Sequence, residues 1–587
     1  MAEEKSQDTQ DTQDTSTFMC SIDPCPNGIE LIEMTVDDMI VNVTEQYLED
    51  IDPDVIYDTI ELKSILLSVI YAFIDAHNKR YKNNKWKKRS TLYPIQIAMI
   101  LMKFHTIRMI KMYEDSCNGG SSNMLLAIYQ EFGENEGLYM AQDRQLKRLI
   151  QNWNKSITLM EMKQVIEYLE NNSAVVTRSD SPTLIAVQNG IFDFETKRLD
   201  AFSPDIVFTS KCRVYYNPSA TDPVVIHNDE DGSDWEVGAW LEDMFDYDPD
   251  IVEVIWQILS ALVRPNVKWE KCIWFYSTKG NNGKGTLCEL MKNLVGRDMC
   301  ASIKIADFKK EFMLEPLLHA SAIVVDENDV GKYVDEAANF KAIITGDTIT
   351  INRKHRIPIT FQPHMLQVQC INELPQFKDK SESLYRRQLI IEFKKSFTGH
   401  ERKYIKHDYL NRAEVLEYIL YRVLHMDHTE IKETPSMKDM MKKYKNYNEP
   451  VRDFLEEILE ETKLDFLPQS LLWDMFKAWS FKNNPHGTLP KRNKFMEEMK
   501  NVMESDTEWV YHENPVCRAR LMLYRCEPLL KEYRLSEWQG QYPGDDYMSN
   551  TKINVKHRGY ERVTPRYPAF TSTGSTTGDT DTEDQDS

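Results

Sequence analysis

"FYSTKGNNGKGTLCEL", residues 275–290, is a glycine-rich turn set between two apolar segments. The apolar run "CIWFY" (272–276) predicts a short buried strand, and "TLCELMKNLVG" (286–296) has the spacing of a helix that ends at Gly296. A glycine-rich turn from a strand into a helix can curl its backbone N–H groups around a phosphate, at the positive end of the helix dipole. The stretch therefore predicts a nucleotide-binding loop in an α/β fold.

Two residues of this loop depart from the usual phosphate-loop pattern. Thr278 stands where the first glycine is expected, and Gly285 follows the lysine where a hydroxyl residue usually holds Mg²⁺. We expect Thr278 to be tolerated because the tightest turns fall at the later glycines, and Thr286 to supply the displaced hydroxyl. A glycine-rich surface turn is the alternative for this segment alone. The predicted nucleotide-binding residues are Gly280, Asn281, Asn282, Gly283, Lys284, Gly285 and Thr286.

A second apolar run ends in two carboxylates. In "ASAIVVDEND" (320–329), mostly apolar residues lead into Asp326 and Glu327, as in a buried parallel strand. The carboxyl end of such a strand lies at the same sheet edge as the phosphate loop. Asp326 would hold Mg²⁺ together with Thr286, and Glu327 would orient the attacking water, because phosphoryl transfer needs mainly positioning and charge neutralisation. An ordinary strand with an acidic exit turn is the alternative.

Polar residues also mark the ends of two further apolar strands. "MLQVQCINELP" (365–375) predicts a strand that ends at Asn372, whose amide could bond the attacking water or the terminal phosphate without adding negative charge. In "LYRRQLIIEF" (384–393), Arg386 and Arg387 precede a strand. Such a pair commonly lies on a solvated edge, but beside a hydrolysis site one of them is a candidate arginine finger offered to a neighbouring subunit.

A family resemblance rests on four segments in this order: "KGNNGKGT", "AIVVDEN", "FKAIITGDTITINRKHRIPITFQPHMLQVQCINELP" and "YRRQLIIEF". They resemble the superfamily III helicases, in the branch of the poxvirus and the phage and plasmid primase-helicases. The resemblance extends more loosely over residues 95–525. It implies an AAA+ type ATPase that uses ATP and Mg²⁺, assembles as a homo-oligomer, usually a hexameric ring, and acts on single-stranded or forked DNA.

The segment "KAIITGDTITINRKHR" (341–356) resembles an extra motif of that family, which is followed by a hairpin that projects into the ring channel. The residues agree, because "TITIN" alternates like a strand and "IPITF" supplies a second strand. The tip between them is basic and would face DNA phosphates. A solvated basic turn is the alternative. The predicted DNA-binding residues are Arg353, Lys354, His355 and Arg356.

The formal net charge of -22 is high for a DNA-binding protein, but it is unevenly placed. Residues 1–54 contain 15 acidic residues and one lysine, and residues 571–587 contain five acidic residues and no base. Without these two ends the chain carries a net charge of only about -3. A nearly neutral body with a local basic hairpin suits a ring that binds DNA in its channel and binds little on its outer surface. Both ends have the composition of disordered tails.

The ten cysteines are scattered along the chain. Cys20 and Cys25 form the closest pair, without histidines nearby, so we expect neither a disulfide framework nor a zinc site. No signal peptide opens the sequence, and no apolar run reaches the length that crosses a membrane. The sequence therefore predicts a soluble, cytoplasmic protein with no membrane partner, in the host cytoplasm if it is viral.

The predicted fold class is multidomain α/β, with an AAA+ type P-loop ATPase core, a mixed N-terminal domain and a C-terminal winged helix. Two basic stretches have two interpretations each. "NKRYKNNKWKKR" (78–89), with Tyr81 and Trp86, could grip single-stranded DNA or be a solvated linker helix, and "LPKRNKF" (489–495) could begin a recognition helix or be a solvated helix start. The expected segments are a disordered acidic tail (1–30), a helical segment (31–94), a pre-ATPase domain (95–245), the ATPase domain (246–400), a helical connector (401–450), a winged-helix-like domain (451–530), and an extension with an acidic tail (531–587).

The predicted function is an ATP-dependent replicative DNA helicase of a phage, satellite or plasmid. Only about 90 residues precede the family resemblance, without a primase motif, so we expect a separate primase or other replication proteins as partners. Two alternatives belong to other classes. A nucleotide kinase would need an arginine-rich lid soon after the loop, and a carboxylate strand and an asparagine strand follow instead. An ATP-switched initiator or scaffold without processive unwinding is harder to separate by sequence.

Overall fold

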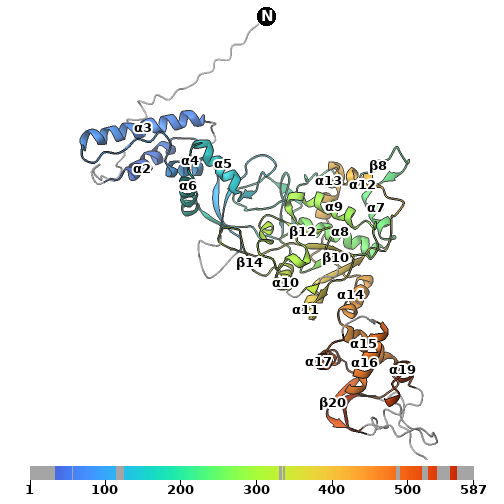
Figure 1. The fold of residues 1–587 in the computed structure, drawn as a ribbon. Coiled ribbons are helices and arrows are strands. Elements are labelled where there is room, and N and C mark those ends of the chain that lie inside the picture. Colours follow the sequence, from blue (N-terminus) through green and yellow to red (C-terminus); the bar gives the residue numbers. More distant parts are fainter. Residues whose placement is uncertain are drawn as a thin grey trace, which may run out of the picture. The chain divides into compact units, whose positions relative to one another are not determined.

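In a computed structural model, the chain forms two compact units, residues 1–437 and 438–587, each of which is described by itself (Figure 1). The predicted acidic tails and the pair Cys20 and Cys25 lie outside the described residues. Among the residues that the structure describes, no helix has both the length and the hydropathy needed to cross a membrane. The structure describes residues 34–113 apart from 54 and 56, 124–329, 333–334, 337–483, 489–517 apart from 505, 527–538 and 555–564.

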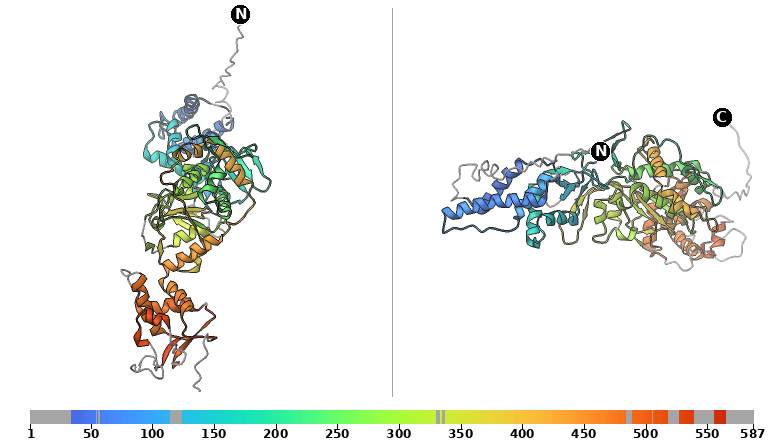
Figure 2. Two further views of the ribbon diagram at one scale, coloured as in Figure 1. Left: turned by 90° about the vertical axis from the view of Figure 1, so that its right-hand side faces the viewer. Right: turned by 90° about the horizontal axis from the view of Figure 1, so that it is seen from above.

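The first unit begins with helices that pack around one hydrophobic core. A capping box at Thr35 starts the first helix and Asp58 caps the second, so polar residues set both starts. The expected boundary at residue 95 cuts this core, because Pro94 opens a helix whose buried residues pack against the earlier ones. The blue and teal helices of this core stay together in both views of Figure 2. They are α2 (Val36–Glu49), α3 (Thr59–Arg80), α4 (Pro94–Phe104), α5 (Asp143–Trp153) and α6 (Leu159–Asn172).

Short sheets connect these helices to the main core of the unit. The first has the order β3-β2-β1-β4, and the second is a meander of β5, β6 and β7. Two helices follow, α7 (Val237–Met244) and α8 (Pro249–Val263). The strands are β1 (Ile107–Lys111), β2 (Met124–Tyr129), β3 (Tyr139–Met140), β4 (Val175–Thr177), β5 (Leu184–Val187), β6 (Gly190–Asp193), β7 (Arg198–Asp200), β8 (Ile226–His227) and β9 (Asp234–Trp235).

The main sheet of the unit has five parallel strands in the order β11-β12-β16-β10-β18. Nearly every residue of the four longer strands is buried, as expected for parallel strands covered on both faces. The connection from β10 to β11 skips two positions, so the chain changes direction in the sheet beside β10. Crevices for ligands form at such switch points, at the carboxyl ends of the strands. The strands are β10 (Cys272–Tyr276), β11 (Cys300–Ala301), β12 (Ala322–Val325), β16 (Gln367–Ile371) and β18 (Gln388–Glu392).

Alternating side chains of β10 show which elements cover each face of this sheet. Ile273 and Phe275 belong to the core that α8 and α9 (Lys284–Val295) also enter. Trp274 points the other way, to the rings of Phe340 on α10 (Ala338–Thr345) and Phe377 on β17 (Gln376–Phe377). Helix α9 ends at Gly296, which has a φ of 109°, so the predicted end of this helix is confirmed.

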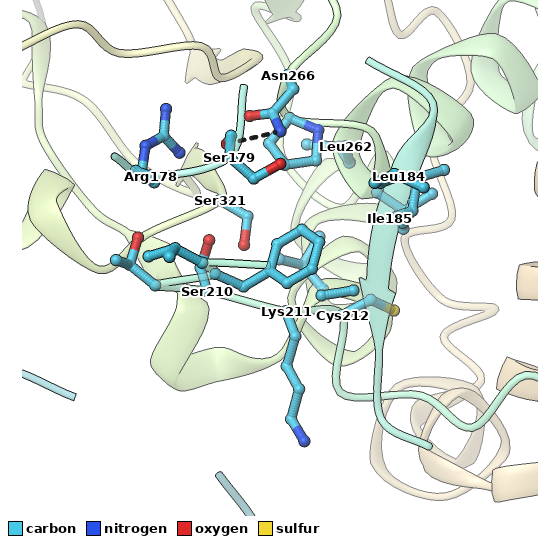
Figure 3. A pocket seen from close by; sticks show the side chains of 17 residues that line it. Arg178, Ser179, Leu184, Ile185, Ser210, Lys211, Cys212, Leu262, Asn266 and Ser321 are labelled. Atoms are coloured by element: carbon cyan, nitrogen blue, oxygen red, sulfur yellow. Dashed lines mark hydrogen bonds between the residues drawn. The ribbon is translucent and has the colours of Figure 1, made fainter. Parts of the chain in front are cut away.

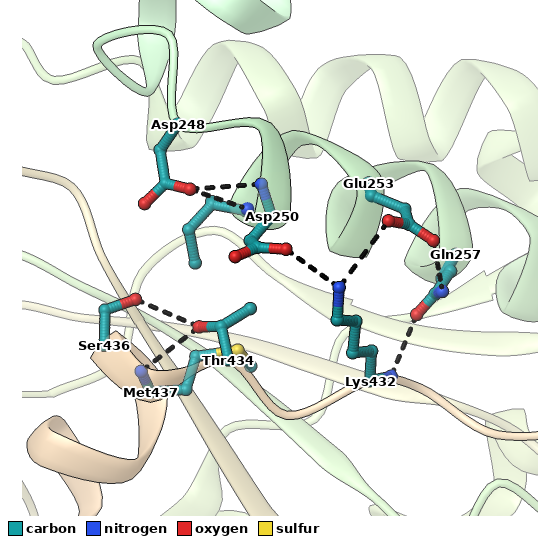
Figure 4. A network of polar contacts seen from close by, with 9 residues as sticks. Asp248, Asp250, Glu253, Gln257, Lys432, Thr434, Ser436 and Met437 are labelled. Atoms are coloured by element: carbon teal, nitrogen blue, oxygen red, sulfur yellow. Dashed lines mark hydrogen bonds and ion pairs between the residues drawn. The ribbon is translucent and has the colours of Figure 1, made fainter.

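The predicted connector is split between the two units. Lys432 donates its backbone N–H to Gln257 of α8 over 2.9 Å, and its ammonium lies 2.8 Å from Asp250 (Figure 4). This segment, with α12 (Lys403–His407) and α13 (Ala413–Leu424), therefore packs on the first unit. Helix α14 (Pro435–Asn448) crosses the boundary between the units.

The second unit packs its helices and an antiparallel sheet with the order β19-β21-β20 around one hydrophobic core. Its middle strand, β21, lies in the segment 531–587, which the sequence analysis assigned to an extension rather than to the domain. That expectation is corrected, because β21 pairs with strands far away in the sequence and no local pattern marks it. The elements are α15 (Pro450–Glu461), β19 (Phe466–Pro468), α16 (Gln469–Asn483), α17 (Arg492–Met503), β20 (Trp509–Val516), α19 (Pro528–Glu532) and β21 (His557–Arg562).

Candidate functional site

The glycine-rich turn leads from β10 into the first turn of α9, as the sequence predicts. Gly283 has a φ of 87°, a left-handed conformation that favours glycine, and a Cβ there would also lie 2.9 Å from the Cε of Met244. The other left-handed residue of the turn is Asn281, with a φ of 52°. Asparagine tolerates this conformation better than most residues. The tight turns therefore fall at Asn281 and Gly283, and Gly280 does not carry one.

Lys284 begins α9 and is almost fully buried. Its Nζ donates to the carbonyl oxygens of Ser277 and Ile371 over 3.3 and 3.1 Å, and to Oδ1 of Asn372 over 2.8 Å. Burial lowers the pKa of this ammonium. These acceptors hold the charge at the carboxyl ends of β10 and β16, beside the loop. The structure thus brings Lys284 and Asn372 together.

Asp326 directly follows β12 and lies against the first turn of α9. A Cβ on Gly285 would stand 3.1 Å from Oδ1 of Asp326 and 3.5 Å from its Oδ2. The glycine therefore leaves room for the carboxylate, which explains why a larger residue is missing after the lysine. Thr286 is the next residue of the same turn, so both predicted Mg²⁺ ligands lie at this helix end. Glu327 is exposed beside them.

Strand β16 lies between β10 and β12, so Asp326 and the loop are not on adjacent strands. Asn328, which the sequence analysis did not select, links the strand ends. Its Oδ1 accepts from the N–H of Ile305 over 3.1 Å, and its Nδ2 donates to Oε1 of Gln369 and to the carbonyl of Cys370 over 3.0 and 2.9 Å. This buried amide holds the carboxylate segment against β16. No spacing in the sequence indicates such a role.

Arg386 and Arg387 lie at the other edge of the sheet. Gln388 pairs with Cys272, so both arginines are level with residues before β10, whereas the loop follows it. A separation of six residues along a strand is about 20 Å. Arg387 donates to the carbonyl of Ser383 over 2.6 Å and also bonds its hydroxyl, whereas the side chain of Arg386 is exposed. The structure therefore does not bring either arginine to the loop of its own chain.

The predicted hairpin is present, with β14 (Ile349–Ile351) paired to β15 (Ile359–Phe361). Two basic residues of its tip face acidic residues of the same chain. The Nε of Arg353 lies 3.9 Å from Glu315, with 9% of the side chain exposed, and Arg356 forms an ion pair with Asp143. Lys354 and His355 are exposed. Binding of DNA by these four residues stays a prediction, which the exposed pair supports most directly.

The aromatic residues of the basic stretch 78–89 pack against other residues of the first unit. The ring of Trp86 stacks on His77, with centroids 3.6 Å apart, and the backbone N–H of Trp86 donates to Oδ1 of Asn78 over 2.7 Å. Tyr81 also contacts the ring of His77, at 4.9 Å. One face of Trp86 is therefore covered by the protein. The basic stretch 489–495 leads into α17, at the position predicted for it.

A hollow of about 430 Å³, including space open to solvent, lies away from the loop. Figure 3 shows hydroxyl and amide groups around it, among them Ser210, Asn266 and Ser321. Ser321 immediately precedes β12, so the hollow is at the amino edge of the sheet, opposite the loop. No residue predicted for the nucleotide site lines it.

Family models match three parts of the chain. A model described as D5 N terminal like matches residues 69–246, and a poxvirus D5 protein-like model matches residues 446–527. Two parts of the chain are therefore similar to viral D5 proteins. A family of unknown function matches residues 275–387 of this D5-like chain, a range that includes every residue predicted to act in hydrolysis. The expected resemblance to the poxvirus branch is confirmed.

Two viral proteins are similar to the D5-like chain over part of their length. It is 23% identical over 285 residues to "Putative helicase 121R" of Invertebrate iridescent virus 3, which covers 46% of this chain and 29% of that protein. It is 28% identical over 224 residues to "Putative helicase L207/L206" of Acanthamoeba polyphaga mimivirus, which covers 37% and 22%. The chain spans less than a third of the length of these curated relatives.

Solved structures of an NrS-1 C-terminal region are similar at a lower level. One apo structure is 12% identical with a TM-score of 0.39, covering 81% of this chain and all of that one. Another, of residues 305–718, is 13% identical with a TM-score of 0.39, covering 80% and 99%. The fold is therefore assigned from the strand order of the chain itself.

Proposed function

We propose that this D5-like chain is an ATP-hydrolysing DNA helicase with a P-loop core of the AAA+ type, which replicates the DNA of a virus or another mobile element. One observation carries the proposal: Lys284, Asp326 and Asn372 meet at the carboxyl edge of one parallel sheet, beside a glycine-rich turn. Phosphate charge would be met by the ammonium and the helix N-terminus. Glu327, exposed at the same edge, would orient the attacking water.

The residues at this edge also fit Mg²⁺. A carboxylate and a hydroxyl, from Asp326 and Thr286, are the oxygen ligands that this cation prefers. Mg²⁺ would neutralise charge on the phosphates when it is bound. Gly285 keeps the carboxylate close to the loop, and Lys284 supplies a fixed positive charge. ATP with Mg²⁺ is therefore the proposed substrate complex.

We propose that the active form is a ring, of six subunits by family resemblance. The arginine pair is about 20 Å from the loop of its own chain along the strands, so an arginine finger would have to serve a neighbouring copy. Arg386 is the better candidate, because Arg387 is tied to Ser383. We also propose that the second unit, whose helices pack in one core with the sheet β19-β21-β20, is a winged-helix domain and a further DNA contact.

In this proposal the hairpin tip carries DNA through the ring, with priming supplied by another polypeptide. An ATP-switched initiator or scaffold is the second candidate. It is favoured by the ion pair of Arg356 with Asp143, which leaves the tip fewer charges for DNA. ATP turnover with and without single-stranded DNA, measured beside fork unwinding, separates the two. We expect DNA-stimulated turnover and unwinding. Turnover without unwinding would favour the scaffold, and the absence of turnover would overturn the helicase proposal.

A further inference from the structure

Two cysteines that are 82 residues apart in the sequence meet behind the phosphate loop. Cys288 lies on α9 and Cys370 on β16, and their Sγ atoms are 3.2 Å apart. Val325 pairs with Gln369, so Asp326 is level with Cys370. A carboxylate oxygen of Asp326 and the two sulfur atoms all lie within 4.8 Å of one another. The sequence analysis found no zinc spacing, because this cluster forms only in three dimensions.

These three groups have the chemistry of a soft metal site. Both thiols are buried, with 0% and 2% of the residue exposed, while Asp326 is exposed and opens the cluster to solvent. The mutual contact, and then burial, raise the pKa of the Cys288 thiol well above its usual range. Lys284, beside the cluster, favours the anionic ligands by its charge.

The geometry requires only small movements. Tetrahedral Zn²⁺ with Zn–S bonds of about 2.3 Å holds its sulfur ligands about 3.8 Å apart, so the sulfur atoms would separate by roughly half an ångström. Gly285 lies on the same face of α9 as Cys288, and its lack of a side chain leaves room for the carboxylate of Asp326 to approach the cation. Three protein ligands leave a fourth position for water. Two thiolates and a carboxylate would be balanced by the cation and the ammonium of Lys284.

We propose that Cys288, Cys370 and Asp326 bind a thiophilic divalent cation, Zn²⁺, and that this cation inhibits nucleotide hydrolysis by withdrawing Asp326. Binding releases two thiol protons and forms two metal–sulfur bonds and one metal–oxygen bond. Mg²⁺ does not take thiolate ligands, so the two cations compete only through the carboxylate. The inhibition, but not the binding, rests on the proposed function.

Co²⁺ is the probe for the binding step, because thiolate coordination gives it a charge-transfer absorption band. We expect the reduced full-length protein to show this band at one equivalent and to lose it when Zn²⁺ is added. Cys288→Ser and Cys370→Ser should each weaken binding about a hundredfold or more, since a thiolate ligand is lost. Cys272→Ser is the matched control, a buried cysteine on the adjacent strand β10. It should bind Co²⁺ as the wild type does.

Asp326→Asn tests the site without altering the buried thiols, because Asp326 is exposed. It should keep the fold and weaken Co²⁺ binding about tenfold or more. Equal binding by the wild type and Cys288→Ser, or no thiolate band at all, would overturn the proposal. A disulfide between the two cysteines in place of metal uptake, seen as two thiols lost in a thiol titration, would also overturn it.

The inhibition step is measured as the Zn²⁺ concentration that halves ATP turnover at fixed Mg²⁺, relative to each variant's own metal-free rate. This concentration should be at least tenfold higher for Cys370→Ser than for Cys272→Ser. Equal values would overturn the inhibitory role. If the wild type binds Co²⁺ through thiolates but hydrolyses no ATP, the proposed function fails while the metal site stands, so the two failures are distinguishable.

Discussion

Gly285→Ala separates the function of the loop from its stability. The added methyl group would lie 3.1 Å from Oδ1 of Asp326, about 0.3 Å inside an ordinary contact. Since Asp326 is exposed, its carboxylate can move away from the loop at low cost. Alanine also favours the helix over glycine by about 0.5–1 kcal/mol. We therefore expect the melting temperature to stay constant or rise slightly, whereas the position of the carboxylate changes.

The expected functional effect is on Mg²⁺. If Asp326 helps to hold the cation, a shift of its carboxylate should raise the Mg²⁺ concentration for half-maximal ATP turnover about 10- to 100-fold, the usual effect of disturbing a metal site through its surroundings. ATP binding without Mg²⁺ should change little, because Lys284 and the turn are unaltered. The assay is steady-state turnover over a Mg²⁺ series, with a thermal melt of each protein.

Asp326→Ala supplies the control through a double-mutant cycle. In that background the methyl group at position 285 displaces nothing, so Gly285→Ala should raise the melting temperature by the full helix contribution and leave the residual Mg²⁺ dependence unchanged. Wild-type Mg²⁺ dependence in Gly285→Ala would refute the idea that the glycine clears space for the carboxylate. An equal effect in both backgrounds would refute the coupling of the two residues.

Three further predictions address the other parts of the site. Lys284→Ala should abolish ATP turnover with little change in melting temperature, because the lost hydrogen bonds are offset by the removal of a buried charge; normal turnover would exclude the nucleotide site. Arg386→Ala should keep ATP binding and lose about 10³-fold in hydrolysis, while Arg387→Ala should mainly lower stability, and mixing Arg386→Ala with Lys284→Ala should restore some turnover in mixed rings. Lys354→Ala with His355→Ala should keep basal turnover, lose fork unwinding, and reduce the salt slope of single-strand binding by about 0.7 per lost contact; unchanged unwinding would remove the hairpin from the mechanism.

Four of the five strands of the parallel sheet were predictable because each contains a short apolar run, whereas the two-residue strand β11 was not predicted. The predicted β10 coincides with Cys272–Tyr276, and the helix after the loop ends at Gly296 as expected. The strand order could not be read from these runs, since burial on both faces leaves no alternation to fix neighbours. The sequence therefore predicted Asp326 near the loop, but it did not indicate that β16 lies between β12 and β10.

The roles of residues whose partners lie far away along the chain could not be predicted from the sequence. The use of Gly285 depends on Asp326, and the use of Asn328 depends on Gln369 and Cys370. In each case the signal is a contact across strands, not a spacing along the chain. The same holds for β21, whose pairing with β19 and β20 closes the sheet of the second unit.

The partner of Lys284 bears on how the loop can respond to a nucleotide. Its ammonium is held by two carbonyls and by the neutral amide of Asn372. A hydrogen bond between a charged and a neutral group contributes about 1.5–3 kcal/mol to stability. Breaking a buried ion pair costs more, about 3–5 kcal/mol. A carboxylate at position 372 would therefore hold the ammonium away from the phosphates, whereas an amide releases it at lower cost. If Lys284 turned to a phosphate, the Asn372 side chain would be freed at the end of β16, next to the segment that Asn328 ties to the same strand. In the proposed function, asparagine at this position would thus let one movement of Lys284 alter both the loop and the carboxylate edge of the site.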